Sequence, residues 1–376
     1  MAGSSLINET SQRHSMLSGV KVLDLSRVLA GPLCGMMLGD LGASVIKVER
    51  TSGGDETRGW GPPFDERGES AYYLSVNRNK LGLTADLDSS SDVALLQSLV
   101  GEADVVVENF RPGSLERRGL GAATLCVVNP SLVWCTISGF GLESSRPGYD
   151  FVVQAESGWM SITGEPDGAP MKHGIALADV IAGKDAAIAV LGALVARART
   201  GSGRRVHVSL QGSAEAALLN VAQNTLVSGD PPSRWGNAHA NLVPYQVFHA
   251  ADRALVIAVG SDAQWVACAT ALELHQLAAE PALRTNAGRL AARNRIVLDM
   301  GARISERPAA ACLAALERAG VPCGIVRSIP EVLSSTHGSA LTGMPPSVPG
   351  AVDRGPPTLG EHSASIRARG WGAFDD

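Results

Sequence analysis

Strand-like runs alternate with helical segments through the first 140 residues, and no other feature of the sequence constrains the fold as much. The helical segments cover 31–41 and a set of apolar residues at helical spacing, Leu95, Leu96, Leu99 and Val100. Strands that are apolar almost throughout are typical of a parallel sheet covered on both faces. We therefore expect an α/β fold with a Rossmann-like large domain. The strand-like runs are 20–26, 44–50, 80–87, 103–110 and 132–140.

The second half of the chain predicts more of this sheet and then a smaller α/β domain. A helix is expected from Asp179 to residue 200, where the glycines of 201–203 end it. A strand at 204–211 and a helix at 212–229 follow, and the Gly-, Pro- and Asn-rich stretch 229–246 indicates a domain boundary. The expected organisation is a flexible N-terminus at 1–16, a large domain at 17–228, a small domain at 229–330, and a C-terminal segment at 331–376 that returns to the large domain.

Composition excludes several classes of protein. A formal net charge of −5 gives no global field that would attract nucleic acid or an anionic membrane. The first residues lack the apolar region of a secretory signal. The longest apolar run, "AAIAVLGALVARA", is shorter than the roughly 20 residues that span a bilayer. We expect a cytoplasmic protein with no nucleic-acid or membrane partner, whose cysteines stay reduced.

Metal and nicotinamide sites are also not expected. The six cysteines form no CxxC pair and the eight histidines form no HxxxH spacing, so no metal site is predicted. The first strand is followed by "SRVLAGPLCG" and not by GxGxxG, the glycine pattern that admits a pyrophosphate. Glu49 ends the second strand, where an acidic residue can bind a ribose hydroxyl, but without the glycines this single match is weak.

One carboxylate, Asp179 in "GIALADVIAG", stands among small and apolar residues where a helix begins. Asp is favoured at helix N-caps, so capping is the simpler interpretation. The alternative is that Asp179 is a reagent.

Ten stretches of the sequence together resemble the class III coenzyme A transferases, the CaiB/BaiF family that includes formyl-CoA transferase, carnitine CoA-transferase and the α-methylacyl-CoA racemases. The resemblance runs in order from residue 17 to 365. Within the family, "RWGNAHANLVPYQVF" is most similar to the branch of succinate-hydroxymethylglutarate CoA-transferase. The stretches are "DLSRVLAGPLCGMMLGDLGASVIKVER", "GDETRGW", "NRNK", "VENFRPG", "GYDFVVQAESG", "ALADVIAGKDAAIAVLGAL", "TGSGRRVHVSL", "NAHANLVPYQVF", "GVPCGIV" and "PPTLGEH".

The resemblance implies a CoA transferase that needs no metal and no nicotinamide. In this family the aspartate that matches Asp179 is the covalent nucleophile, and we expect the helix N-terminus to keep it ionised. The family also implies a homodimer of two interlocked rings, with an acyl-CoA donor and a carboxylic acid acceptor. A short dicarboxylic donor such as succinyl-CoA is expected from the branch. The CoA contacts implied by resemblance are Arg27, Val28, Ala30, Arg50, Lys80, Asn109, Phe110 and Arg117.

At several positions this sequence departs from the family pattern or leaves the role of the residue open. Ser138 stands where formyl-CoA transferase has a lysine, which leaves one charged contact in doubt. Tyr149 replaces the histidine of the racemases, and a phenol with an ordinary pKa near 10 is a poor base, so racemase is the alternative and not the main hypothesis. Asp150 is interpreted as a turn or cap residue.

Substrate and lid residues are expected in the second half of the chain. Arg234 or His239 can meet a distal carboxylate, or both can be structural. Gly260 and Gln264, in "GSDAQW", match the glycine-rich loop that covers the nucleophile in this family, or form an ordinary strand-to-helix turn. A catalytically silent CoA-binding protein on the same fold is the third hypothesis.

Overall fold

The computed structural model describes residues 15–375, so most of the expected flexible N-terminus, 1–14, lies outside the described residues. The chain divides into two compact units. The first unit contains Met1–Trp159, His173–Ala222 and Thr336–Asp376, and the second contains Met160–Lys172 and Gln223–Ser335. The C-terminal stretch therefore belongs to the same unit as the N-terminal half.

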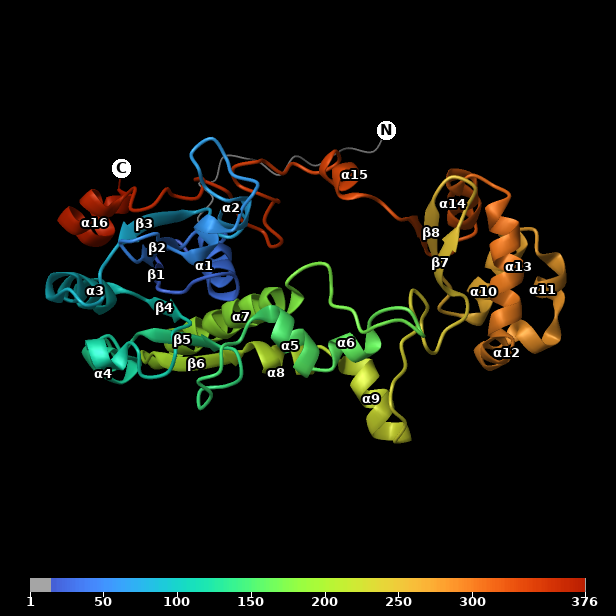
Figure 1. The fold of residues 1–376 in the computed structure, drawn as a ribbon, viewed down its shortest axis with the longest axis horizontal. Helices are drawn as coiled ribbons and strands as arrows, with labels where there is room; N and C mark the ends of the chain where they lie inside the picture. The colour runs from blue at the N-terminus through green and yellow to red at the C-terminus, as the bar shows by residue number, and fades with distance from the viewer. Residues whose placement is uncertain (1–14, 376) are drawn as a thin grey trace. The chain divides into compact units, whose positions relative to one another are not determined.

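The first unit is built on a six-stranded sheet in the order β3-β2-β1-β4-β5-β6, with every pair parallel (Figure 1). The predicted α/β fold with a parallel sheet is confirmed. The order in which the chain adds strands reverses at β1: β2 and β3 lie on one side of it, and β4, β5 and β6 lie on the other. Open sheets of this kind bind their ligands at this reversal point, between β1 and β4. The strands are β1 Lys21–Asp24, β2 Ser44–Glu49, β3 Lys80–Thr84, β4 Val105–Glu108, β5 Val133–Ser138 and β6 Arg204–Ser209.

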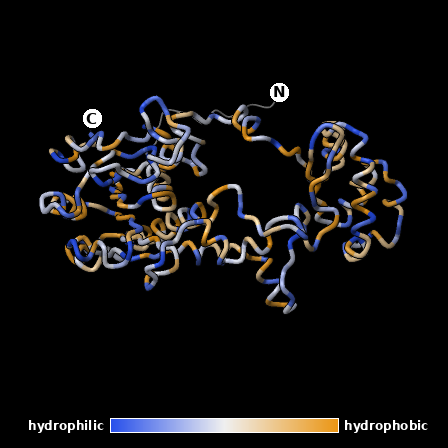
Figure 2. The backbone as a smooth tube through the Cα atoms, in the orientation of Figure 1, coloured by the Kyte–Doolittle hydropathy of each residue, from blue (hydrophilic) through white to orange (hydrophobic). Residues whose placement is uncertain are grey.

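Helices cover both faces of this sheet because successive strand residues point to opposite sides. Val22 and Val105 pack with Cys34 of α1 and Ala186 of α7, whereas Leu23 packs on the other face with residues of α3, α4 and α16. Figure 2 shows the hydrophobic stretches that run along these strands. The helices are α1 Ala30–Asp40, α2 Ala71–Leu74, α3 Ser90–Glu102, α4 Ala122–Val128, α5 Asp150–Glu156, α7 Leu177–Thr200, α8 Leu210–Ala216 and α16 Ser363–Arg369, with 3-10 turns η1 Glu56–Gly59, η2 Glu116–Arg118 and η4 Gly370–Phe374.

One predicted helix is divided in two. The sequence favoured a single helix over 212–229, but α8 ends at Ala216 and α9 Leu219–Ser228 begins after a break. Leu219, the first residue of α9, has a φ of 38°, so a right-handed helix cannot continue through it from α8. Helix α9 and the short helix α6 Trp159–Ile162 each contain residues of both units.

The second unit pairs a small antiparallel sheet, in the order β7-β8-β9, with a layer of helices. Its core includes Trp265, Ile296 and Leu316, all fully buried. The elements are β7 Tyr245–His249, β8 Ala254–Ala258, β9 Cys323–Ile325, α10 Asp262–Ala271, α11 His275–Ala279, η3 Pro281–Arg284, α12 Asn286–Ala291, α13 Arg293–Ser305, α14 Ala309–Arg318 and α15 Ile329–Leu333.

Candidate active site

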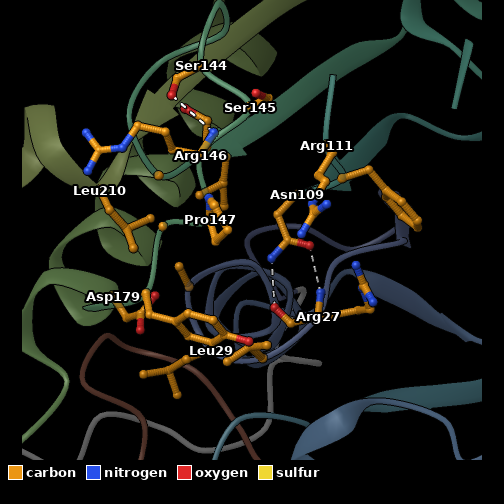
Figure 3. Close-up of a pocket in the computed structure, with 18 of the residues that line it drawn as sticks. Arg27, Leu29, Asn109, Arg111, Ser144, Ser145, Arg146, Pro147, Asp179 and Leu210 are labelled. Atoms are coloured by element: carbon orange, nitrogen blue, oxygen red, sulfur yellow. Dashed lines mark hydrogen bonds between the residues drawn. The ribbon is translucent and has the colours of Figure 1, made fainter. Parts of the chain in front are cut away.

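A pocket of about 380 Å³ opens at the carboxyl ends of β1, β4 and β5 in the first unit (Figure 3). Its walls are the loop that follows β1, the segment after β4 and the loop after β5, and Asp179 of α7 lies at its edge. This is where the strand order reverses, so the fold itself makes the cleft. Seven of the residues expected from the sequence line this one pocket: Arg27, Val28, Ala30, Asn109, Phe110, Tyr149 and Asp179.

Two of these residues are joined by a reciprocal pair of hydrogen bonds. The Arg27 backbone N–H donates to Asn109 Oδ1 at 2.9 Å, and Asn109 Nδ2 donates to the Arg27 carbonyl at 2.8 Å (Figure 3). The Arg27 guanidinium lies 5.3 Å from the centre of the Phe110 ring and pairs with Glu56 at 2.8 Å. The ends of β1 and β4 are thereby held together, with a cation and an aromatic face at the pocket wall.

Two glycines fix the loop after β5. A Cβ on Gly139 would lie 2.4 Å from Gly148 Cα, so the two backbones touch and no larger residue fits at either position. The loop they close carries Ser144 and Arg146 at the pocket, and Tyr149, which also lines it, directly follows Gly148. Ser138, at the end of β5, accepts the Gly141 N–H and bonds to His207 Nε2 at 2.8 Å.

Asp179 is the third residue of α7 and not its N-cap, which is Ala176. Burial, reinforced by the negative charge of Asp150, raises the pKa of Asp179 to about 7, although a hydrogen bond from the Ala30 backbone N–H lowers it. The helix N-terminus therefore does not keep Asp179 fully ionised. Burial and the neighbouring carboxylate of Asp150 raise its pKa although it lies in the first turn of α7, and the side chain titrates near neutral pH.

Asp150 performs the capping that the sequence allowed for Asp179. Its Oδ1 accepts the Ala178 N–H at 2.8 Å and the Asp179 N–H at 3.4 Å, both at the start of α7. Its Oδ2 accepts a bond from Gln154 Nε2 at 2.6 Å. Because Asp150 satisfies these amides from α5, the Asp179 side chain is not required as a cap.

A second pocket of about 250 Å³ contains Arg50 and shares Arg27 and Phe110 with the first. Arg50 Nε donates to the Gly54 carbonyl at 2.7 Å. Glu49 also lines this pocket, but Arg58 donates to both its carboxylate oxygens, at 2.8 and 2.7 Å. That engagement removes Glu49 as a free acceptor for a ribose hydroxyl.

Two expected CoA contacts lie elsewhere. Lys80 is fully buried beneath the sheet end, where its Nζ donates to Asp24 at 2.8 Å, to the Pro32 carbonyl at 2.8 Å and to Asn77 at 2.9 Å. Every donor of the Lys80 ammonium therefore has a protein partner, and Lys80 lines neither pocket. Arg117 is exposed and lines neither pocket, whereas its neighbour Arg118 lines the second.

The four remaining expected residues belong to the second unit. Arg234 donates to the carbonyls of 165 and 168 at 3.1 and 2.7 Å, and so orders the segment 161–168. His239 packs against the Tyr245 ring at 5.1 Å. Gln264 Oε1 accepts the Gly260 N–H at 2.8 Å.

Two cations in the first pocket, Arg111 and Arg146, are not among the residues expected from the sequence. Arg111 stands two residues after Asn109 in "VENFRPG", so its position beyond a strand end was the available signal. Arg146 pairs with Glu156 and lies 4.2 Å from the Phe140 ring centre, and no motif marked it.

Within residues 15–375 no group of His, Cys, Asp and Glu could hold a metal ion. None of the helices in that range is long and apolar enough to cross a membrane.

Several known proteins are similar to this chain over most of its length. The succinate–glutarate CoA-transferase of Agrobacterium fabrum is 39% identical, over 96% of this chain and 97% of that protein. The mouse succinyl-CoA:glutarate CoA-transferase is 40% identical, over 93% of this chain and 85% of that one. The crystal structure of a CAIB/BAIF family protein from Brucella suis superimposes with a TM-score of 0.82 at 39% identity, over 93% of this chain and 98% of that one. CoA-transferase family III matches residues 17–363, and the chain belongs to this family.

Proposed function

We propose that this protein transfers CoA from a short dicarboxylic acyl-CoA, such as succinyl-CoA, to a carboxylic acid acceptor through a covalent intermediate on Asp179. The observation that carries the proposal is the state of Asp179: this carboxylate lines the pocket, is not needed as a cap because Asp150 caps α7, and lies beside the Ala30 backbone N–H. The names of the relatives, which specify succinate and glutarate, support a dicarboxylic donor and acceptor.

The chemistry exchanges one thioester for another. The Asp179 carboxylate attacks the thioester carbonyl, which gives a mixed anhydride and releases the CoA thiolate. The thiolate attacks the Asp179 carbonyl of the anhydride, which forms an aspartyl thioester and frees the donor acid. The acceptor carboxylate then attacks the aspartyl thioester, which gives a second mixed anhydride and again releases the CoA thiolate. The thiolate attacks the acceptor's carbonyl of this anhydride, which forms the new acyl-CoA and restores the Asp179 carboxylate. The Ala30 N–H that contacts Asp179 is suited to stabilise the oxyanions formed on its carbonyl.

CoA is assigned to the two joined pockets. Arg27, with Arg111 beside it, offers guanidinium groups to phosphates, and Phe110 offers a ring face to the base. Arg50 extends the same surface into the second pocket. The proposal includes the homodimer of interlocked chains and a lid role for Gly260 and Gln264, which follow from the family resemblance, and the cytoplasmic location expected from the sequence.

The test is a direct assay of transfer. The protein is mixed with succinyl-CoA and glutarate, and glutaryl-CoA and succinate are followed by mass spectrometry. We expect both products in equal amounts. Exchange of the α-hydrogen of an acyl-CoA in deuterated water, without an acceptor, would instead identify a racemase. CoA binding with neither reaction would identify a silent binder.

A further inference from the structure

We infer that the buried ion pair of Lys47 and Asp55 is a positioning device that holds the loop Ser26–Ala30 so that the Ala30 N–H faces Asp179. The inference rests on the proposed function, because it gives that N–H a role in the reaction of Asp179. Neither Lys47 nor Asp55 was singled out by the sequence, and neither lines the pocket that contains Asp179.

The loop contains a residue in an unfavourable conformation. Val28 has a φ of 72°, in the left-handed region that a β-branched side chain rarely adopts. Such a conformation persists only where the surrounding structure holds it, and outliers of this kind gather at functional sites. Ala30 follows two residues later, so the backbone direction at Val28 sets where the Ala30 N–H points.

The ion pair holds this loop at two positions. The Val28 N–H donates to both carboxylate oxygens of Asp55, at 3.3 and 3.2 Å. Lys47 Nζ donates to the Ser26 carbonyl at 3.1 Å and to Asp55 Oδ2 at 3.1 Å. The contacts therefore fix the loop at the left-handed residue and two positions before it.

The pair itself is rigidly held and remains charged. Neither side chain has any exposed surface, and Asp55 also accepts bonds from the Thr57 N–H at 3.0 Å and the Thr57 hydroxyl at 2.8 Å. Burial would raise the pKa of Asp55, but attraction to Lys47 and the Thr57 bonds outweigh it and lower the pKa. Burial would lower the pKa of Lys47, but attraction to Asp55 outweighs it and raises the pKa.

A buried ion pair is a weak source of stability but a strong geometric constraint, and this one constrains a catalytic loop. Without it, Val28 is free to return to negative φ, and the Ala30 N–H turns away from Asp179. Because that N–H lowers the pKa of Asp179, its loss would raise this pKa further and leave less of the reactive carboxylate at neutral pH.

The experiment compares Asp55→Asn with a matched variant, Asp40→Asn. Asp40 is also a buried carboxylate paired with a cation, Arg78 at 2.7 Å, but it ends α1 far from the pocket. Thermal stability, kcat, KM and the pH dependence of covalent labelling of Asp179 by succinyl-CoA are measured for both variants and the parent protein. We expect Asp55→Asn to lower kcat about 10-fold to 100-fold and to move the labelling midpoint to higher pH. Asp40→Asn should lower the melting temperature with the midpoint unchanged.

Equal effects of the two variants on kcat and on the midpoint would overturn the inference. If Asp55→Asn does not fold, Thr57→Val removes one hydroxyl contact to Asp55 and leaves the ion pair in place. It should move the midpoint in the same direction with a smaller loss of kcat, and an unchanged midpoint would overturn the inference. Absence of labelling in the parent protein would overturn both this inference and the proposed function, whereas labelling with no variant-specific shift overturns this inference alone.

Discussion

The starts of two helices, α7 in the first unit and α10 in the second, treat their polar side chains differently. At α10 three polar side chains bond within the unit: Ser261 accepts the Gln264 N–H, Gln264 accepts the Gly260 N–H, and Asp262 pairs with Arg289 at 2.9 Å. At α7 the cap comes from Asp150 on another helix, and Asp179 stays at the pocket with a pKa of about 7.

The difference separates a structural helix start from a reactive one. An N-terminal carboxylate that is spent on capping and ion pairing has a stabilised charge and little nucleophilic use. A carboxylate that is buried beside a like charge lowers the stability of the fold because its charged form is disfavoured, but it is reactive near neutral pH.

Asp179→Asn should have the largest effect. We expect at least about a 1000-fold loss of transfer activity, because the nucleophile is removed. The free energy of unfolding should rise, since the raised pKa means that the folded chain binds this proton more tightly than the unfolded chain. The stabilisation should grow from about pH 4 to about pH 7 and level off above. Chemical denaturation at several pH values measures it, and a variant that is less stable at pH 8 would contradict the account.

Gly183→Ala should have the next largest effect. A Cβ at Gly183 would lie 2.6 Å from the Ala30 carbonyl oxygen, so α1 and α7 would be forced apart where Ala30 meets Asp179. We expect kcat to fall about 10-fold to 100-fold, and stability to fall by about 1–3 kcal/mol. Gly192→Ala is the control in the same helix, because its Cβ would meet open space. It should leave kcat unchanged and raise stability by about 1 kcal/mol. A similar kcat for both variants would contradict the importance of the α1 contact.

Asp150→Asn should change the pH dependence more than the maximal rate. The amide oxygen can still accept the Ala178 N–H, but the negative charge that raises the pKa of Asp179 is gone. We expect the midpoint for labelling of Asp179 to move below about 7, the parent value that the raised pKa predicts. Rates of labelling by an acyl-CoA between about pH 5 and about pH 9 measure this midpoint. A midpoint that moves upward would show that Asp150 does not act through its charge.

Ser261→Ala should have the smallest effect. It removes the N-cap of α10 and should lower stability by about 1 kcal/mol. The pH midpoint of Asp179 labelling should not move, because the Ser261 hydroxyl caps α10 and is not among the groups that set the pKa of Asp179. A shifted midpoint would erase the distinction between the two helix starts.

The fold was more predictable from the sequence than the site. Near-continuous apolar strands determine a parallel sheet because such residues must be buried on both faces, and this prediction is confirmed. Lys80 shows the limit: its "NRNK" context suggests an exposed cation, but its partner Asp24 lies 56 positions away on another strand. The pKa of Asp179 was equally out of reach, because burial and the approach of Asp150 are properties of the folded chain.

The most direct test of the central claim is to trap the intermediate. The protein is incubated with succinyl-CoA and quenched with borohydride or hydroxylamine, and the peptide that contains Asp179 is analysed by mass spectrometry. The account predicts modification at Asp179 that is absent without succinyl-CoA and absent in Asp179→Asn. Transfer activity with an unmodified Asp179, or modification at another residue, would contradict it.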